Sequence, residues 1–230
     1  MAASVVKKAP SGSSLSGGGA GTSTTALAFG SAVTAGNLIV VVLQRWREAS
    51  GTLAAATISD GAGNTWYKDA ESINTRDGVT IWHCYANSSV AMSITAAFSD
   101  SAYWCISAYE VSGIAAGLTA GASGNNTGSG SSTSPSAGAV SPSGTCFYIG
   151  GVEFDAAVTC TEASGWTLGG EDESWTYAAG AVEYRTGSGS QTASWTLGTS
   201  SKWAAAVVAY AEAASATYGW LNRNFLWGNY

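Results

Sequence analysis

The chain has 230 residues, of which only 10% are charged and 46% are hydrophobic, and its formal net charge at pH 7 is −6. Globular proteins carry about 25% charged residues, so this composition favours a surface that neighbouring molecules cover or that a particle displays. The nine basic residues are scattered along the chain, which argues against a nucleic-acid partner because phosphate binding needs clustered Lys and Arg. No run approaches the roughly 18 apolar residues of a membrane-spanning helix, so we expect no membrane partner.

The first segment, residues 1–23, is rich in Gly and Ser. Such low-complexity sequence cannot offset the entropy of ordering the backbone, so it is predicted to form a flexible N-terminal arm. No apolar run follows the lysine pair Lys7 and Lys8. We therefore expect no secretory signal, and assembly in a cytosol.

From residue 24 onward, β-branched and aromatic runs alternate with Gly-rich turns, a pattern typical of strands. The run 37–43 is continuously apolar, as in a strand that is buried on both faces. The segment 119–139, rich in Gly, Ser and Thr, is predicted to be a long loop or crossover within one domain. No helix of twelve or more residues is predicted. Residues 24–211 are therefore predicted to form one all-β domain, a two-sheet β-sandwich of the jelly-roll type. Further strands are predicted at 79–86, 92–98, 103–111, 145–152, 175–185, 191–197 and 203–210.

The last segment, residues 212–230, is predicted to be an aromatic C-terminal docking arm. Chain ends stay frayed unless something holds them, and aromatic side chains carry large apolar areas that are unfavourable in water. We therefore expect this segment to bury its side chains against a partner molecule. The predicted partner-binding residues are Tyr218, Trp220, Leu221, Phe225, Leu226, Trp227 and Tyr230.

Catalytic chemistry has few candidates in this sequence. His83 is the only histidine, and we expect it to be a partly buried strand residue on the same face as Ile81 and Tyr85. Three glutamates lie in or beside predicted strands, where two that face one cleft could act as the acid and nucleophile of a glycosidase. The alternative is that they face solvent or pair with basic residues, and we predict no enzyme and no catalytic residue. The three glutamates are Glu110, Glu153 and Glu183.

Metal and cofactor binding are also not predicted. The turn 60–64 and the acidic run 171–173 carry the oxygen ligands that Ca²⁺ prefers. The first lacks the alternating ligands of an EF-hand loop and is a good hairpin turn, and the second is typical of a solvated acidic loop. The four cysteines have no zinc-like spacing, so we predict reduced, buried thiols.

Tryptophan supplies the main alternative function. Trp166 directly follows Gly165 and Trp195 lies three residues before Gly198, both near predicted strand ends. Exposed rings at these positions would form a stacking platform for sugars. The competing interpretation is that these rings pack in the core. An exposed platform would indicate a carbohydrate-binding or adhesion module.

Several segments occur in an order that resembles a β-sandwich module recurring in tailed-phage virion proteins and in some bacterial surface proteins. The likeness covers about residues 24–211 and rests on turn and strand signatures. The segments are Ala35-Gly-Asn-Leu-Ile-Val-Val-Val42, Ile58-Ser-Asp-Gly-Ala-Gly-Asn-Thr-Trp66, Ile81-Trp-His-Cys-Tyr-Ala-Asn87, Tyr109-Glu-Val-Ser-Gly-Ile114, Gly165-Trp-Thr-Leu168, Glu183-Tyr184 and Trp203-Ala-Ala-Ala206.

The resemblance implies a structural or display role and no catalytic residues. The implied protein is a capsid decoration or cement protein, a head fibre or part of a tail, located in the virion and assembled in the host cytoplasm. Its partner would be the major capsid protein or another virion protein. A homo-oligomer is expected, with a trimer favoured. The resemblance does not distinguish a head protein from a tail protein.

Overall fold

The computed structural model describes residues 2–174 and 178–214. Within these ranges the regular elements are all β-strands, and no helix there is long and apolar enough to cross a membrane. The strands are β1 (Ser4–Ala9), β2 (Ser16–Ser23), β3 (Leu27–Ala28), β4 (Leu38–Trp46), β5 (Ala56–Asp60), β6 (Tyr67–Asn74), β7 (Asp77–Tyr85), β8 (Ser93–Ser112), β9 (Gly124–Ser132), β10 (Ser136–Val140), β11 (Thr145–Phe154), β12 (Cys160–Glu162), β13 (Thr167–Asp172), β14 (Ala179–Ser188), β15 (Gln191–Leu197) and β16 (Ser201–Ala211).

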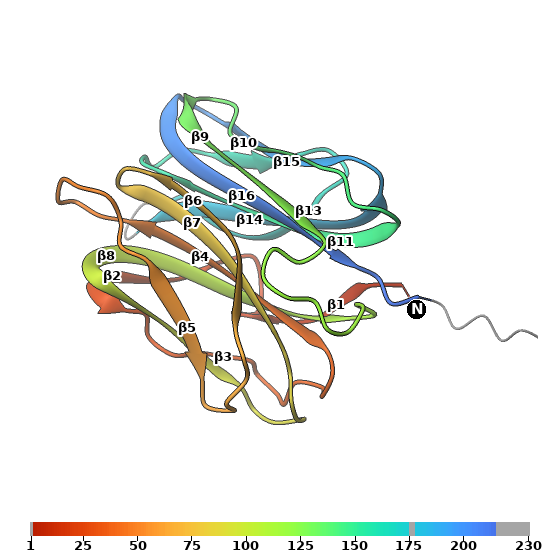
Figure 1. Cartoon of the computed structure of the whole chain (residues 1–230). Coiled ribbons are helices and arrows are strands. Elements are labelled where there is room, and N and C mark those ends of the chain that lie inside the picture. Colours follow the sequence, from red (N-terminus) through yellow and green to blue (C-terminus); the bar gives the residue numbers. More distant parts are fainter. Residues whose placement is uncertain (1, 175–177, 215–230) are drawn as a thin grey trace, which may run out of the picture.

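Two large antiparallel sheets pack face to face, and a smaller sheet covers the second one (Figure 1). The first sheet has the order β1-β8-β4-β7-β6, with β2, β3 and β5 also paired to β8. The second sheet has the order β13-β14-β11-β16-β9, and the small sheet has the order β10-β15-β12. The sheets do not close into a barrel. The predicted all-β sandwich is confirmed.

The central core lies between the two large sheets. Val40 and Val42 of β4 meet Ile149 of β11 and Val208 of β16 there. Because successive strand residues point to opposite faces, the alternate residue Val41 of β4 enters a different core. The run 37–43 was predicted to be buried on both faces, and β4 is buried in this way.

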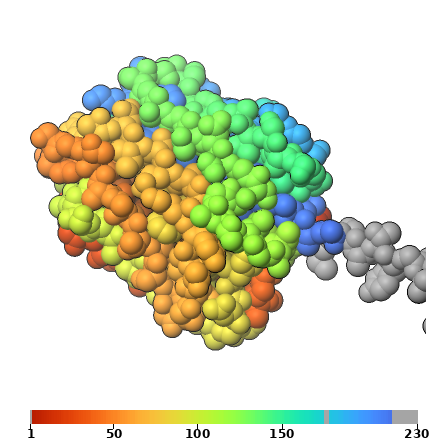
Figure 2. Space-filling model, in the orientation of Figure 1, coloured from red at the N-terminus to blue at the C-terminus, as the bar shows by residue number. Residues whose placement is uncertain are grey.

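Two further cores lie on the outer faces of the large sheets. The outer face of the first sheet packs under Leu27 of β3 and Ile58 of β5. The outer face of the second sheet packs under Ala193, Trp195 and Leu197 of β15 in the small sheet. The central core contains residues of both halves of the chain, and Figure 2 shows the colours of the first half on one side of the body and those of the second half on the other.

The strand β8 joins two segments that were predicted as separate strands at 92–98 and 103–111. It runs without interruption and curves through the sheet (Figure 1). Its first part pairs with β3 and β5, and its second part pairs with β1 and β4. β2 pairs along both parts of β8, from Ile106 to Ala97, so the two predicted segments form one strand.

The N-terminal segment departs from its prediction as a flexible arm. Residues 4–9 and 16–23 are the sheet strands β1 and β2, each paired with β8. Gly18 lies directly over the indole of Trp104, where an added Cβ would come within 2.2 Å of the ring. Glycine here permits close backbone approach, so the composition that suggested flexibility instead fits a strand lying on an aromatic ring.

The segment 119–139 was predicted to be a loop, but it also forms strands that pack against an aromatic ring. It contains β9, which pairs with β16, and β10. Gly130 lies against the Trp203 ring, where an added Cβ would be 3.1 Å from the ring atom Cζ2. Its small residues therefore allow a strand to pack closely.

The two ends of the described chain meet at one corner. The backbone N–H of Ala3 donates to Oε1 of Glu212 at 2.8 Å, and the N–H of Ala213 donates to the carbonyl of Gly113 at 2.8 Å. The seven predicted partner-binding residues between 218 and 230 lie outside the described residues.

Candidate functional site

The three candidate glutamates are all fully buried, but they face three different cores. Glu110 lies on the outer face of the first sheet, because its neighbour Tyr109 points into the central core. Glu183 lies on the outer face of the second sheet, because its neighbour Val182 points into the central core. Glu153 lies in the central core itself. No two of them share a cleft, so the two-carboxylate arrangement of a glycosidase is not formed by these residues.

Glu110 holds the edge of the first sheet together. Its carboxylate accepts hydrogen bonds from Nζ of Lys7 at 2.8 Å, Nδ2 of Asn37 at 2.6 Å and the N–H of Thr34 at 2.8 Å. Burial opposes its ionisation, but these donors prevail and lower the pKa of Glu110 below its ordinary value. Its role is to join β1 and the 34–37 turn to β8.

Glu183 has a comparable structural role in the second sheet. Its two oxygens accept hydrogen bonds from the N–H of Ala163 and the N–H of Ser194, both at 2.9 Å. Burial raises its pKa to about 7, although these hydrogen bonds oppose the rise. The carboxyl therefore ties the segment before β13 and the strand β15 to β14.

Glu153 differs from the other two because neither of its oxygens has a hydrogen-bond partner among the described residues. It faces Asp77, which is also buried, across the central core. Burial, followed by the charges of Asp77 and Asp155, raises the pKa of Glu153 well above its ordinary value. Burial and then Asp155 raise the pKa of Asp77 to about 7. The protein interior therefore favours the protonated form of Glu153.

His83 was expected to be partly buried, but it is completely buried. Its Nδ1 lies 2.7 Å from Oδ2 of Asp69, and its Nε2 lies 3.2 Å from the carbonyl oxygen of Leu118. Asp69 also accepts hydrogen bonds from the hydroxyl of Tyr210 at 2.6 Å and from the N–H of Gly121 at 3.0 Å. Both ring nitrogens are thus engaged in holding β6, β7 and β16 to the loop after β8.

A small pocket lies beside this buried network. Tyr67 stacks on His83 with ring centroids 5.3 Å apart and planes 28° apart. Tyr67 and Tyr85 line a pocket of about 240 Å³ together with Thr65 and Asn87. Strand alternation predicted that His83 and Tyr85 share a face, but the sequence carries no signal for the pocket. Tyr67 joins it through cross-strand pairing with His83, which the sequence alone does not specify.

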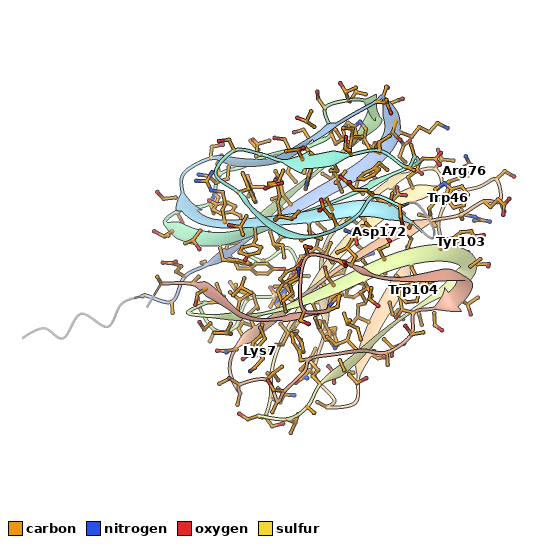
Figure 3. The ribbon with its side chains drawn as sticks, turned by 180° about the vertical axis from the view of Figure 1, so that it is seen from behind. Lys7, Trp46, Arg76, Tyr103, Trp104 and Asp172 are labelled. Carbon is orange, nitrogen blue, oxygen red and sulfur yellow. The ribbon has the colours of Figure 1, made fainter. Side chains whose placement is uncertain are left out.

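A second pocket lies at the opposite end of the sheets. Figure 3 shows Trp46, Arg76 and Tyr103 at the end away from Lys7. The rings of Trp46 and Tyr103 lie 5.4 Å apart, and the Arg76 guanidinium lies 5.6 Å from the Trp46 ring centroid. The adjacent pocket of about 330 Å³ is lined by Tyr103 and by small or acidic residues, namely Ala20, Glu48, Ala49 and Ser101.

Trp166 and Trp195 do not form the expected exposed platform. Trp166 is 8% exposed and Trp195 is 2% exposed, and both belong to the core between the second sheet and the small sheet. Tyr148 packs edge-on against Trp166 at 6.4 Å, and the Arg185 guanidinium lies 5.8 Å from its ring. The prediction of sugar binding by exposed Trp166 and Trp195 is therefore wrong, because Trp195 of the small sheet and Trp166, just before β13 of the second sheet, both pack into the core between these two sheets.

The two oxygen-rich segments have structural partners. The carboxylate of Asp60 accepts hydrogen bonds from the N–H of Ala62 at 2.7 Å, Nδ2 of Asn64 at 3.1 Å and Nε1 of Trp66 at 2.7 Å. The 60–64 turn is thus held by its own donors. In the acidic run, Oε1 of Glu173 accepts from the N–H of Cys160.

No group of three or more His, Cys, Asp and Glu side chains within 2–174 and 178–214 is arranged to hold a metal ion. The four cysteines are free and buried, as predicted.

Comparison with known proteins finds no relative. No family model matches the chain, and neither a curated protein nor a solved structure matches it.

Proposed function

We propose that the protein is a structural component of a tailed-phage virion, a decoration or cement protein that binds the major capsid protein or another virion protein non-covalently. The proposal starts from the segment order between 24 and 211 that resembles a phage virion module. The all-β sandwich agrees with that resemblance. The described residues bring together no catalytic pair from Glu110, Glu153 and Glu183, so their arrangement favours a mechanical role over glycoside hydrolysis.

The observation that carries the proposal is the contrast between a closed body and an aromatic C-terminal sequence. In the described part of the chain, the exposed large hydrophobic side chains are only Val6 at 50% and Val90 at 37%. The layered body thus completes its own cores. The segment 218–230 adds five aromatic residues, whose apolar area favours burial against another molecule.

The position of the chain ends supports attachment at one corner. Ala3 and Glu212 are hydrogen bonded to each other, so the described chain ends close to the start of β1. A partner that binds the segment 218–230 would hold the body by one end. The opposite end, with Trp46 and Tyr103 (Figure 3), would then project away from the attachment point.

The test is to delete residues 217–230 and to measure incorporation of the tagged chain into virions. We expect incorporation to be lost while the thermal unfolding of the body is unchanged. A triple variant, Trp220→Ala, Phe225→Ala and Trp227→Ala, should behave in the same way. The matched control changes polar residues of the same segment, Asn222→Ala, Asn224→Ala and Asn229→Ala, and should retain incorporation. Full occupancy by the truncated chain would refute the proposal.

A further inference from the structure

The pocket at the end of β7 has walls that come from two neighbouring strands. Tyr67 is the first residue of β6 and Tyr85 is the last residue of β7. Thr65 precedes Tyr67 by two residues and Asn87 follows Tyr85 by two. The pocket is therefore built on strand ends, which position side chains more rigidly than a free loop does.

Both tyrosine rings are held in place by contacts with other residues of the body. Tyr67 stacks on His83, whose ring nitrogens are fixed by Asp69 and Leu118. The hydroxyl of Tyr85 donates to the carbonyl of Ala115. Because the two tyrosine rings already have a fixed orientation, ligand binding loses little side-chain entropy at the pocket.

The turn beside the pocket is fixed as well. Oδ1 of Asn64 accepts a hydrogen bond from the backbone N–H of Asn87 at 2.9 Å. Asn64 is in turn bonded to Asp60 through Nδ2 at 3.1 Å. The backbone that carries Asn87 is thus tied to the 60–64 turn, so its side chain is presented from a rigid base.

Polar groups of the pocket remain available for a ligand. Within the described chain, the hydroxyl of Tyr67, the hydroxyl of Thr65 and the side-chain amide of Asn87 make no hydrogen bond. Hydroxyls and an amide offer both donors and acceptors. This set matches a ligand that carries several hydroxyl groups, each of which both donates and accepts.

Charge selects against ionic ligands. None of the four lining side chains is charged. The nearby Asp69 is buried, and its oxygens already accept from His83, Tyr210 and Gly121. A charged ligand would therefore find no counter-ion in the pocket, whereas a neutral ligand needs none.

We propose that this pocket binds a neutral sugar residue, with one face of the pyranose ring packed on a tyrosine ring and its hydroxyls bonded to Thr65, Tyr67 and Asn87. The volume of about 240 Å³ accommodates a single sugar ring. Aromatic rings supply apolar contact area for the C–H face of a sugar, and a few placed polar groups fix its orientation. This site uses the sandwich body and no residue of 217–230, so it stands apart from the proposed attachment to a virion.

The experiment is a titration of the full-length ¹⁵N-labelled chain with the methyl glycosides of glucose, galactose, mannose and N-acetylglucosamine, followed by amide chemical shifts. We expect saturable shifts at 65–67 and 85–87 with at least one glycoside. Thr65→Ala, Asn87→Ala and Tyr67→Phe should each weaken its binding by about fivefold, the effect of losing one hydrogen bond. Tyr67→Phe retains the ring stacked on His83, so the fold is preserved.

The matched control is Thr199→Ala, an exposed threonine in the turn between β15 and β16, which should bind as the unmodified chain does. Methyl glucuronide, a charged sugar, should bind more weakly than methyl glucoside. The proposal is overturned if none of the four neutral glycosides gives saturable shifts at the pocket. It is equally overturned if the three pocket variants bind as tightly as the control.

Discussion

Glu153 of β11 and Asp77 of β7 face each other across the central core, and both carboxyl groups are shielded from solvent. Gly151, two residues before Glu153, lies against Val42 and Val79. Since alternate strand residues share a face, Glu153 and Asp77 occupy the next positions along the same interface. Two acids of like charge therefore lie between the sheets, where the protonated form of each is favoured.

Glu153→Gln is expected to stabilise the protein at neutral pH. Burial raises the pKa of the Glu153 carboxyl above its unfolded value of about 4, so this group destabilises the folded protein at neutral pH, and an uncharged amide removes that cost. Glu183→Gln is the matched comparison and should destabilise by roughly 1–3 kcal/mol, because its amide would face the N–H groups of Ala163 and Ser194. The measurement is chemical denaturation at pH 7. Equal effects of the two substitutions would contradict the different environments of the two glutamates.

Asp77 is expected to make stability fall as pH rises. Its pKa in the folded protein is raised to about 7 by burial and then by Asp155, above an unfolded value of about 4. The contribution of Asp77 to the free energy of unfolding is therefore fully favourable below about pH 4, and it is lost as the pH rises from about 4 to about 7.

Asp77→Asn should remove this loss and raise the free energy of unfolding above pH 7 by up to roughly 4 kcal/mol, at about 1.4 kcal/mol per pKa unit. Denaturation curves collected from pH 4 to 8 give the comparison. The exposed Glu48→Gln serves as the control and should leave the pH profile unchanged. A parallel profile for Asp77→Asn and the unmodified chain would show that the Asp77 carboxyl titrates normally.

Gly18→Ala is expected to destabilise the protein by about 1–3 kcal/mol, as overpacking does. An added Cβ would come within 2.2 Å of the Trp104 ring, so β2 or the indole must shift. Gly30→Ala is the control, because an added Cβ there meets nothing within 4 Å. Thermal unfolding of both variants distinguishes the two sites. An unchanged midpoint for Gly18→Ala would mean that β2 does not lie on Trp104.

The full-length chain is expected to form a trimer in solution, in keeping with the proposed virion role. Light scattering after size exclusion should give three times the mass of one chain. Deletion of 217–230 tests whether the C-terminal segment makes the subunit contacts, in which case the truncated chain is a monomer. A monomeric full-length chain would rule out the trimer.

Strand identity was predictable wherever bulky side chains repeat with a recognisable pattern. The runs at 37–43, 79–86, 145–152 and 203–210 became β4, β7, β11 and β16, because β-branched and aromatic residues favour a pleated, buried surface. Strands without bulky residues were missed. In β2 and β9 the stabilising partner is a ring on another strand, Trp104 or Trp203, and no local pattern identifies that ring.

For the predicted site residues, the sequence identified the residue types but did not specify their burial or their grouping. Trp166 and Trp195 are of the residue type that forms a sugar-binding platform. Whether such a ring is buried depends on how the sheets pack, and the packing of the small sheet on the second sheet was not predictable from local sequence. Glu110, Glu153 and Glu183 were correctly singled out as unusual strand carboxyls. Their separation into three cores follows from strand register.

The sequence by itself determined the all-β class, the sandwich and the positions of the longest strands, because these depend on local side-chain type and alternation. Tertiary structure alone decided that Gly18 and Gly130 lie in strands, that Tyr67 and Tyr85 line one pocket, and that Glu153 meets Asp77. Each of these depends on strand pairing and sheet packing between residues far apart in the chain. A one-residue change of register would turn every such side chain to the other face, so only the folded arrangement specifies them.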